Sequence, residues 1–304
     1  MLFLIVLLVS CRGRVPAGEE PIDTATALRL VQTGTEGVEI NFVPNYPPAT
    51  IYDQNELIAL LEVNNRGNHD LEASDCFIQI SGFDPNIIPG NFIQACASNI
   101  GVLEGKNVYN VRGGQNQLEF RSSNINLNVY EYNPTLLAKA CYIYQTTASP
   151  SVCIDPLLYQ ITGEQKACDY RRSIVTGGGQ GAPVGIGYVG VDMVGGKAVF
   201  EINVVNQGGG RVLSPYADIR NCDAGLEYTD LDKVGYTVQM SGGSLIDCSP
   251  RDGLVRLSNN NGKIICRFDV PGSGAYETPL QISLQYGYVK SIIKPLKIIK
   301  TPGS

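Results

Sequence analysis

The chain has 304 residues, 43% of them apolar, which is enough to bury two ordinary cores and too much for a disordered chain. A net charge of −6 argues against nucleic acid as a partner, because a phosphate backbone would be repelled. A single histidine, His69, excludes most histidine-based catalysis, and 34 glycines and 17 prolines between short apolar runs are typical of an all-β protein with many turns.

The chain begins with an unbroken apolar run, MLFLIVLLVSC, that ends at Cys11. At about 1.5 Å per residue this run cannot cross a hydrocarbon layer about 30 Å thick, but it has the length of the apolar h-region of a secretory signal. Residues 8–11 resemble the lipobox of prokaryotic lipoproteins, which implies a lipid on Cys11, although no basic residue precedes the run and Arg12 follows it. An ordinary signal or membrane anchor is the alternative. We therefore expect residues 1–11 to reach the membrane and residues 12–36 to form an extended stalk outside the cytoplasm.

Two predicted strands end in the same phrase, Asn-x-Gly, 141 residues apart. In the run ELIALLEVNNRG the apolar side chains alternate and share one face, and the run KAVFEINVVNQG repeats this pattern. Asn65 then coincides with Asn206, and Gly67 coincides with Gly208. Since Asn can bond the local backbone and Gly tolerates a positive φ, each strand is predicted to leave its sheet through a tight turn.

A second match joins residues 132–144 with residues 276–288, without gaps and at an offset of 144. A weaker echo, IQISG and VQMSG, lies between the two matches and in the same order. The inner tyrosines that the second match superposes are Tyr142 with Tyr286 and Tyr144 with Tyr288. Three matches in one order indicate that a single domain occurs twice.

The Gly-rich segment at residues 176–183 separates the two copies and is predicted to be a short linker. We expect an all-β chain with two tandem β-sandwich domains, at residues 37–175 and 184–304, each with about seven short strands. The Asn-x-Gly phrase and the alternating strands after it resemble immunoglobulin-like modules of the adhesion and CARDB-like kind, found in tandem on prokaryotic and especially archaeal surface proteins. The resemblance implies an extracytoplasmic binding or structural role and carries over no catalytic residue.

Eight cysteines follow Cys11, an even number that fits four disulfides in an oxidising compartment. No Cys-x-x-Cys pair occurs, which disfavours a zinc cluster. Strand faces, the loop that one pair would close and the two cysteines then left over favour one set of pairs among the many that are possible. These pairs are Cys76 with Cys96, Cys248 with Cys266, Cys141 with Cys153, and Cys168 with Cys222.

Two further patterns resemble chemical sites. GIGYVG, at residues 185–190, matches the dinucleotide phrase G-x-G-x-x-G, but a strand rather than a helix is predicted after it. Asp223, Asp230 and Asp232 could hold Ca²⁺ in an extracellular loop, although solvated turns explain them more simply. We therefore predict no catalytic, metal-ligating or cofactor-binding residue, and no cofactor.

Tyr286 and Tyr288 continue the inward register of the strand that holds them, so we predict that they lie in the core. A tyrosine cluster at residues 128–134 could instead serve recognition at the surface. The C-terminal run, residues 288–304, carries four lysines among Ile and Leu. We expect it to pair within its own domain, where the lysines would protect a free edge. Completing a neighbouring copy is the alternative, and residues 12–36 could act in the same way.

These patterns predict a non-enzymatic surface protein, tethered to the membrane through its N-terminus, that serves adhesion, scaffolding or envelope structure. Its partners would be other surface proteins or copies of itself. The alternative is a subunit of an extracellular filament or surface layer, assembled by β-strand exchange or edge pairing. A third class, a secreted hydrolase, requires a cleft with two converging carboxylates, which the sequence does not show.

Overall fold

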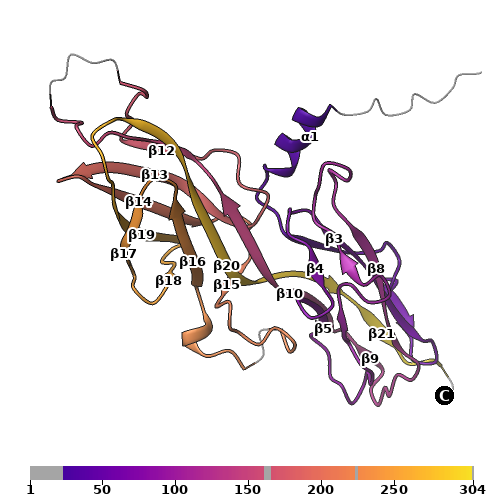
Figure 1. Cartoon of the computed structure of the whole chain (residues 1–304). Coiled ribbons are helices and arrows are strands. Elements are labelled where there is room, and N and C mark those ends of the chain that lie inside the picture. The colour runs from indigo at the N-terminus through magenta and orange to yellow at the C-terminus, as the bar shows by residue number, and fades with distance from the viewer. Residues whose placement is uncertain (1–22, 161–165, 223–224, 303–304) are drawn as a thin grey trace, which may run out of the picture.

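The computed structural model describes residues 23–160, 166–222 and 225–302. Strands dominate these ranges, which confirms the predicted all-β class. Figure 1 shows two bodies of strands: the first body contains β1 to β9, and the second contains β12 to β19. The apolar run at residues 1–11, with Cys11, lies outside the described residues. No helix in the described part is long and apolar enough to cross a membrane.

The segment expected to be an extended stalk is partly helical. Helix α1 (Thr24–Val31) begins after Asp23, whose carboxylate accepts the backbone N–H of Ala25 and of Thr26 at 3.0 Å each. Ala27 is buried, so the helix contacts the rest of the chain. The N-cap and the absence of Gly and Pro from residues 24–31 explain why this part of the segment is helical.

The first body has two main sheets. One runs β1-β3-β8 and consists of β1 (Val38–Phe42), β3 (Leu57–Asn65) and β8 (Gln115–Ser122). The other includes β10 (Thr135–Ala148), β5 (Cys76–Ser81) and β6 (Ile93–Ala95). Four short strands complete this body: β2 (Thr50–Tyr52), β4 (Leu71–Glu72), β7 (Val102–Leu103) and β9 (Glu131–Tyr132).

The second body repeats this arrangement with a wider sheet. This sheet runs β12-β13-β14-β19-β17 and consists of β12 (Ser173–Val175), β13 (Val184–Val194), β14 (Lys197–Asn206), β19 (Asn261–Asp269) and β17 (Ser244–Ser249). The other sheet includes β16 (Lys233–Met240), β18 (Leu254–Arg256), β15 (Arg211–Leu213), β11 (Ser151–Ile154) and β20 (Tyr276–Pro295). The chain ends with β21 (Lys297–Ile299), and a 3₁₀ turn covers Tyr228–Asp230.

The alternation seen in the sequence places the predicted residues in the core. Leu57, Ala59, Leu61 and Val63 of β3 are fully buried, and so are Ala198, Phe200, Ile202 and Val204 of β14. Both sets face inward because successive side chains of a strand point to opposite faces.

Two long strands join the bodies into one sheet. β10 and β20 pair antiparallel from Thr135 opposite Pro295 to Ala148 opposite Ile282, and β5 and β16 pair on their outer sides. Figure 1 shows β20 leaving the second body and crossing into the first, while β10 extends the other way. The two bodies therefore share a continuous ladder of backbone hydrogen bonds.

This ladder places the two sequence repeats about a pseudo-two-fold axis. Tyr142 lies opposite Tyr288, and Tyr144 lies opposite Tyr286. With the sequence offset of 144, Ile143 in the first repeat is equivalent to Gly287 in the second. These two residues also lie opposite each other in the ladder. Because equivalent antiparallel strands pair at equivalent residues, the axis passes between Ile143 and Gly287.

The last strand of each repeat pairs with the other repeat. β11 follows β10 and pairs with the start of β20, where Ile154 lies opposite Tyr276. β21 follows β20 and pairs with β9 and β2, where Ile298 lies opposite Tyr132. Both isoleucines are fully buried. The prediction that the C-terminal strand pairs within its own domain was therefore wrong, because β20 has already carried the chain into the first body.

The lysines of this C-terminal run are also engaged rather than simply exposed at an edge. Lys290 Nζ donates to the carbonyl oxygen of Gly208 at 2.7 Å, and Lys297 forms a 2.7 Å ion pair with Glu131. These contacts tie the C-terminal run to the loop before β15 and to β9.

The Gly-rich segment at residues 176–183 is docked rather than free. The N–H of Gly34 donates to Gly178 O at 2.7 Å, and the N–H of Gly181 donates to Gly34 O at 2.9 Å. A Cβ on Gly179, where φ is +72°, would lie 2.2 Å from Gly34 O. Glycine is required there because the two backbones approach so closely. Strand pairing also does not follow the expected limits at residues 175 and 184, since β11 and β12 both pair with strands of the second repeat.

Four disulfides join the described cysteines. Two are the predicted pairs Cys76–Cys96 and Cys248–Cys266, and the others are Cys141–Cys222 and Cys153–Cys168. The two remaining predictions, Cys141 with Cys153 and Cys168 with Cys222, were wrong. The pairing of Cys141 with Cys153 assumed that the chain reverses direction after β10. Instead, β11 continues in the same direction and pairs with the same edge of β20 in the same register. An extended path of this length separates Cys141 from Cys153 by about 40 Å.

Candidate functional site

The Asn-x-Gly phrase of the first repeat holds a buried tyrosine at the junction of the two bodies. Asn65 Nδ2 donates to His69 O at 2.7 Å, and the Tyr144 hydroxyl donates to Asn65 Oδ1 at 3.0 Å. The backbone N–H of His69 donates to the Tyr144 hydroxyl oxygen at 3.3 Å. We call this set of three residues the first latch.

The second repeat builds the same set of bonds. Asn206 Nδ2 donates to Gly210 O at 2.9 Å, the Tyr288 hydroxyl donates to Asn206 Oδ1 at 2.9 Å, and the N–H of Gly210 donates to the Tyr288 oxygen at 2.7 Å. These three residues form the second latch. The same phrase therefore recurs because the same hydrogen-bond network recurs, which the spacing of Asn and Gly alone did not reveal.

The glycine of each phrase makes room for the tyrosine hydroxyl. A Cβ on Gly67 would lie 2.0 Å from the Tyr144 oxygen, and a Cβ on Gly208 would lie 2.6 Å from the Tyr288 oxygen. Real Cβ atoms do not approach oxygen so closely, so neither position accepts a side chain without displacing the latch. Close approach, rather than a positive φ, explains these two glycines.

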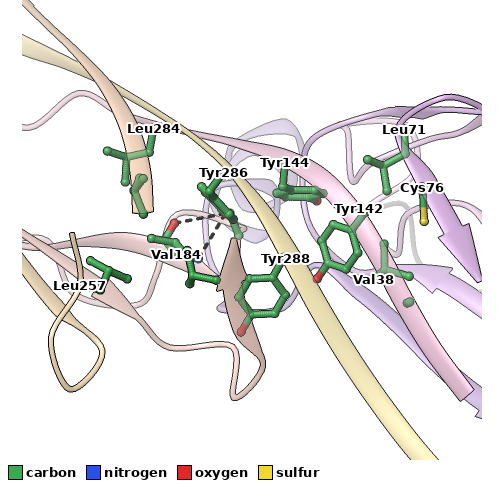
Figure 2. Close-up of a cluster of buried hydrophobic side chains, with 14 of the residues drawn as sticks. Val38, Leu71, Cys76, Tyr142, Tyr144, Val184, Leu257, Leu284, Tyr286 and Tyr288 are labelled. Carbon is green, nitrogen blue, oxygen red and sulfur yellow. Dashed lines mark hydrogen bonds between the residues drawn. The ribbon is translucent and has the colours of Figure 1, made fainter. Parts of the chain in front are cut away.

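Four tyrosines meet at the pseudo-two-fold axis (Figure 2). At most 1% of each side chain is exposed, which confirms the prediction that Tyr286 and Tyr288 lie in the core. The ring centroids of Tyr142 and Tyr288 lie 5.6 Å apart, and those of Tyr144 and Tyr286 lie 6.4 Å apart. The Tyr286 hydroxyl accepts the N–H of Val184 at 3.2 Å, marked in Figure 2. Aromatic packing and satisfied hydroxyls make this cluster a rigid centre.

Burial controls the ionisation of these phenols. It raises the pKa of Tyr288 to about 12 against an ordinary value near 10, and the N–H of Gly210 opposes this shift in part. Burial also raises the pKa of Tyr142, Tyr144 and Tyr286 above the ordinary value. The four phenols therefore stay neutral at physiological pH, where they position strands rather than transfer protons.

A cavity of about 670 Å³ lies in the second body, between β16 and the edge strand β17. This volume is in the range of small-molecule sites. Leu245 on β17 is 50% exposed although its neighbour across the ladder, Phe268, is buried, so the core is open to solvent at this edge. The apolar side chains that line the cavity are Tyr236, Val238, Met240, Leu245 and Phe268.

The first repeat fills the corresponding space with its own side chains. Its segment at residues 82–114 buries Ile88 and Phe92, and the ring centroid of Phe92 lies 4.8 Å from that of Phe83 and 6.4 Å from that of Phe120. The second repeat has a shorter segment, residues 241–260, between the matching strands. The sequence analysis did not predict the cavity, although this difference in segment length was the signal for it.

Charged groups stand at the mouth of the cavity. Asp247 accepts a hydrogen bond from Arg267 Nε at 2.7 Å, and this bond lowers the pKa of the Asp247 carboxyl. Arg251 also lines the cavity, and it has no ion pair within the described residues. The cavity therefore combines an apolar interior with Asp247, whose charge is paired with Arg267, and with Arg251, whose guanidinium can face a negative group of a ligand.

The other motifs singled out in the sequence lie apart from this cavity. Residues 185–190, GIGYVG, lie within β13 and are followed by the paired strand β14 rather than by a helix. Asp230 caps the 3₁₀ turn by accepting the N–H of Glu227 at 3.1 Å. Asp223 lies outside the described residues, and the described ones contain no group of three or more potential metal ligands. His69 is half-buried, with its ring centroid 5.2 Å from that of Tyr144.

Comparison with known proteins adds little to this geometry. No family model matches the chain, and no curated protein matches it. Among solved structures, the secreted serine protease VesC from Vibrio cholerae is 11% identical, with a TM-score of 0.21. The match covers 86% of this chain and 52% of VesC, so the chain spans about half the length of that protein. A likeness of this kind carries no argument about fold or function.

The buried phenols predict a loss of stability in alkaline solution. The pKa of Tyr288 is about 12 in the folded chain and near 10 in the unfolded chain. The contribution of this residue to the free energy of unfolding is therefore complete below pH 10 and declines as the pH rises to 12. Tyr288→Phe should therefore reduce the slope of the unfolding free energy against pH in this window by about 1.4 kcal/mol per pH unit. Urea unfolding at several pH values measures that slope. The matched control, Tyr109→Phe, changes a residue that is 98% exposed and should leave the slope unaltered. Equal slopes in both variants would contradict the account.

Proposed function

We propose that the chain is a non-enzymatic, membrane-tethered surface protein that works outside the cytoplasm in adhesion, scaffolding or envelope structure. The set of four disulfides carries this proposal. Such bonds persist in oxidising compartments and are rare in the cytosol. The apolar run ending at Cys11 supplies the tether.

The arrangement of the sheets supports two immunoglobulin-like modules. In the first body the sheet β1-β3-β8 is accompanied by a second sheet that contains β5 and β10. In the second body the strands β13-β14-β19 are accompanied by a second sheet that contains β16 and β20. We propose that each body is one such sandwich whose final strand has been exchanged with the other. The shared ladder and the latches then make the pair a rigid double module, a form suited to presenting a surface at a distance from a membrane.

The cavity between β16 and β17 supports binding rather than hydrolysis. Hydrolysis of a glycosidic bond uses two carboxyl groups, one of which is held protonated. Asp247 is the carboxylate that lines this cavity, and its bond to Arg267 favours the ionised form. We propose that the cavity takes an apolar group of a ligand while Arg251 faces an acidic group beside it.

Cell fractionation tests the location. The full chain, produced in a bacterial host, should enter the membrane fraction, be cut by protease added outside the cytoplasmic membrane, and show no thiol that reacts at the eight cysteines after Cys11. Cys11→Ala should release the protein from the membrane while leaving the disulfides intact, because the anchor and the fold are separate. Chain that stays in the cytosol with reactive thiols would contradict the proposal.

A fluorescent probe tests the cavity. Anilinonaphthalene sulfonate joins an apolar ring system to a negative charge, so it should bind the folded chain with increased fluorescence. Val238→Phe should abolish most of this signal because it fills the cavity, and Arg251→Glu should weaken binding about tenfold through charge reversal. The matched control is Arg220→Glu, at an exposed position elsewhere in the second repeat. Equal binding of the probe by all variants would contradict the proposal that the cavity is the ligand-binding site.

A second candidate is a subunit of an extracellular filament or surface layer. The observation that supports it is that β11 pairs with a strand of the second repeat and β21 with strands of the first, a reciprocal arrangement that strand exchange between copies could use. Light scattering on the oxidised chain separates the candidates, since a tethered module remains monomeric and a filament subunit forms polymers as its concentration rises.

A further inference from the structure

The junction of the two bodies has the character of an interface between two separate chains. One register runs from Glu131 opposite Ile299 to Ile154 opposite Tyr276, across β9, β10 and β11 on one side and β20 and β21 on the other. Each side presents equivalent residues to the other about a two-fold axis. This is the isologous geometry of a symmetric dimer, in which the same patch is used twice.

We infer that the junction is an exchange interface whose second partner is another copy of this chain, so that the first repeat of one copy pairs with the second repeat of the next. This inference rests on the second candidate function and names the surface that would build it. β21 binds between β2 and β9, which belong to the first repeat, and these strands present the same backbone groups whichever copy supplies β21.

The buried side chains at the ends of the ladder fit this exchange. Ile154 and Val152 of β11 are fully buried beside β20 of the second repeat. Ile298 of β21 and Leu296, which directly precedes this strand, are buried in the first body. Neither repeat buries its own last strand, so each is incomplete until a partner repeat docks. Separation of the two repeats would expose these four side chains, and the exposed apolar surface would drive re-pairing with any available copy.

The segment between the repeats can act as the hinge. A Cβ added to Gly177 would have no atom within 4 Å. Gly178 has a φ of +86°, and a Cβ added there would meet only the methyl group of Thr33. The docked part of the segment is held to Gly34 by backbone hydrogen bonds, which re-form with the first repeat of another copy. Consecutive glycines make such a segment flexible once it is released.

The Cys141–Cys222 disulfide joins the first repeat to whichever second repeat has paired with it. Cys141 lies on β10 in the first repeat, and Cys222 lies in the second repeat, in a small apolar cluster with Leu213 and Val289. Of the four described disulfides, Cys76–Cys96 and Cys248–Cys266 lie within single repeats, and Cys153–Cys168 joins two points before residue 176. Cys141–Cys222 is therefore the bond that becomes intermolecular when copies exchange.

Concentration decides between the two pairings. A repeat attached to the same chain has an effective concentration of about millimolar, so dilute chains close on themselves. Chains crowded by a common tether approach this concentration, and exchange between copies then competes. Once Cys141–Cys222 has formed, separation of the paired repeats requires its reduction, so the pairing made during folding persists.

Isotope mixing tests the inference on the full chain. Equal amounts of ¹⁴N-labelled and ¹⁵N-labelled protein are reduced, unfolded and refolded together over a range of concentrations with glutathione disulfide as oxidant. In each bond formed, two thiols lose two electrons and two protons, and glutathione disulfide is reduced to two molecules of glutathione. Mass spectrometry of disulfide-linked peptides then shows whether the two halves of each bond come from one molecule or two.

The expected result is specific to one bond. Cys141–Cys222 peptides should contain light–heavy hybrids whose share rises with protein concentration, towards about half at full exchange. The internal controls are Cys76–Cys96, Cys153–Cys168 and Cys248–Cys266, which should remain wholly light or wholly heavy. Absence of hybrids at Cys141–Cys222 at every concentration would overturn the inference, and so would hybrids at all four bonds, which indicate random oxidation.

A variant keeps the test independent of oxidative refolding. The double substitution Cys141→Ser, Cys222→Ser removes the bond across the junction and should make the chain form reversible oligomers as concentration rises. Its matched control, Cys76→Ser, Cys96→Ser, removes a bond within the first repeat and should remain monomeric. Identical monomers in both would overturn the inference.

Assembly length is measured separately by light scattering on the refolded samples. Hybrids confined to closed pairs of chains would establish the exchange interface and remove the filament candidate. Long polymers without hybrids at Cys141–Cys222 would retain the filament candidate and overturn exchange in favour of edge pairing. The failure of the inference and the failure of the function are thus distinguished.

Discussion

The pairing of β10 with β20 is the constraint on which the rest of the structure depends. These strands are the equivalent strands of two sequence repeats, and they pair at equivalent residues, so the two bodies must be related by a pseudo-two-fold axis. From that axis it follows that β11 enters the second body and β21 enters the first. The bodies cannot separate without breaking the longest ladder in the described chain and exposing the cores at both of its ends.

The latches hold this ladder in register. Each latch fixes a tyrosine of β10 or β20 to the end of a strand in the opposite sheet, and the hydroxyl, the amide and a backbone N–H satisfy one another. A register slip by one residue would turn the tyrosines away from their asparagines and leave several buried polar groups unpaired. The Asn-x-Gly phrase therefore helps to specify the register of the ladder that joins the two bodies.

Sequence reasoning predicted what depends on local pattern. Alternation predicted the buried face of β3, and the repeat predicted the equivalence of Asn65 with Asn206. Strand parity predicted Cys248–Cys266, and closure of the loop between the two cysteines predicted Cys76–Cys96. It did not predict where β11 and β21 pair, because the residues after β10 contain Pro150, which reads as a turn, whereas the chain continues along β20. Cys141–Cys222 was missed for the same reason. The cavity depends on which side chains a neighbouring loop supplies, and a strand pattern carries no information about that.

Hydrogen exchange in two matched core variants tests the shared ladder most directly. Leu61→Ala weakens β3 in the first body and Ile202→Ala weakens β14 in the second, each by about 2–5 kcal/mol. If each last strand pairs with the other repeat, Leu61→Ala should speed amide hydrogen exchange in β21 and leave the amides of β11 protected. Ile202→Ala should speed amide hydrogen exchange in β11 and leave the amides of β21 protected. If Leu61→Ala instead exposes β11 and leaves β21 protected, each repeat keeps its own last strand, and the account of the junction is contradicted.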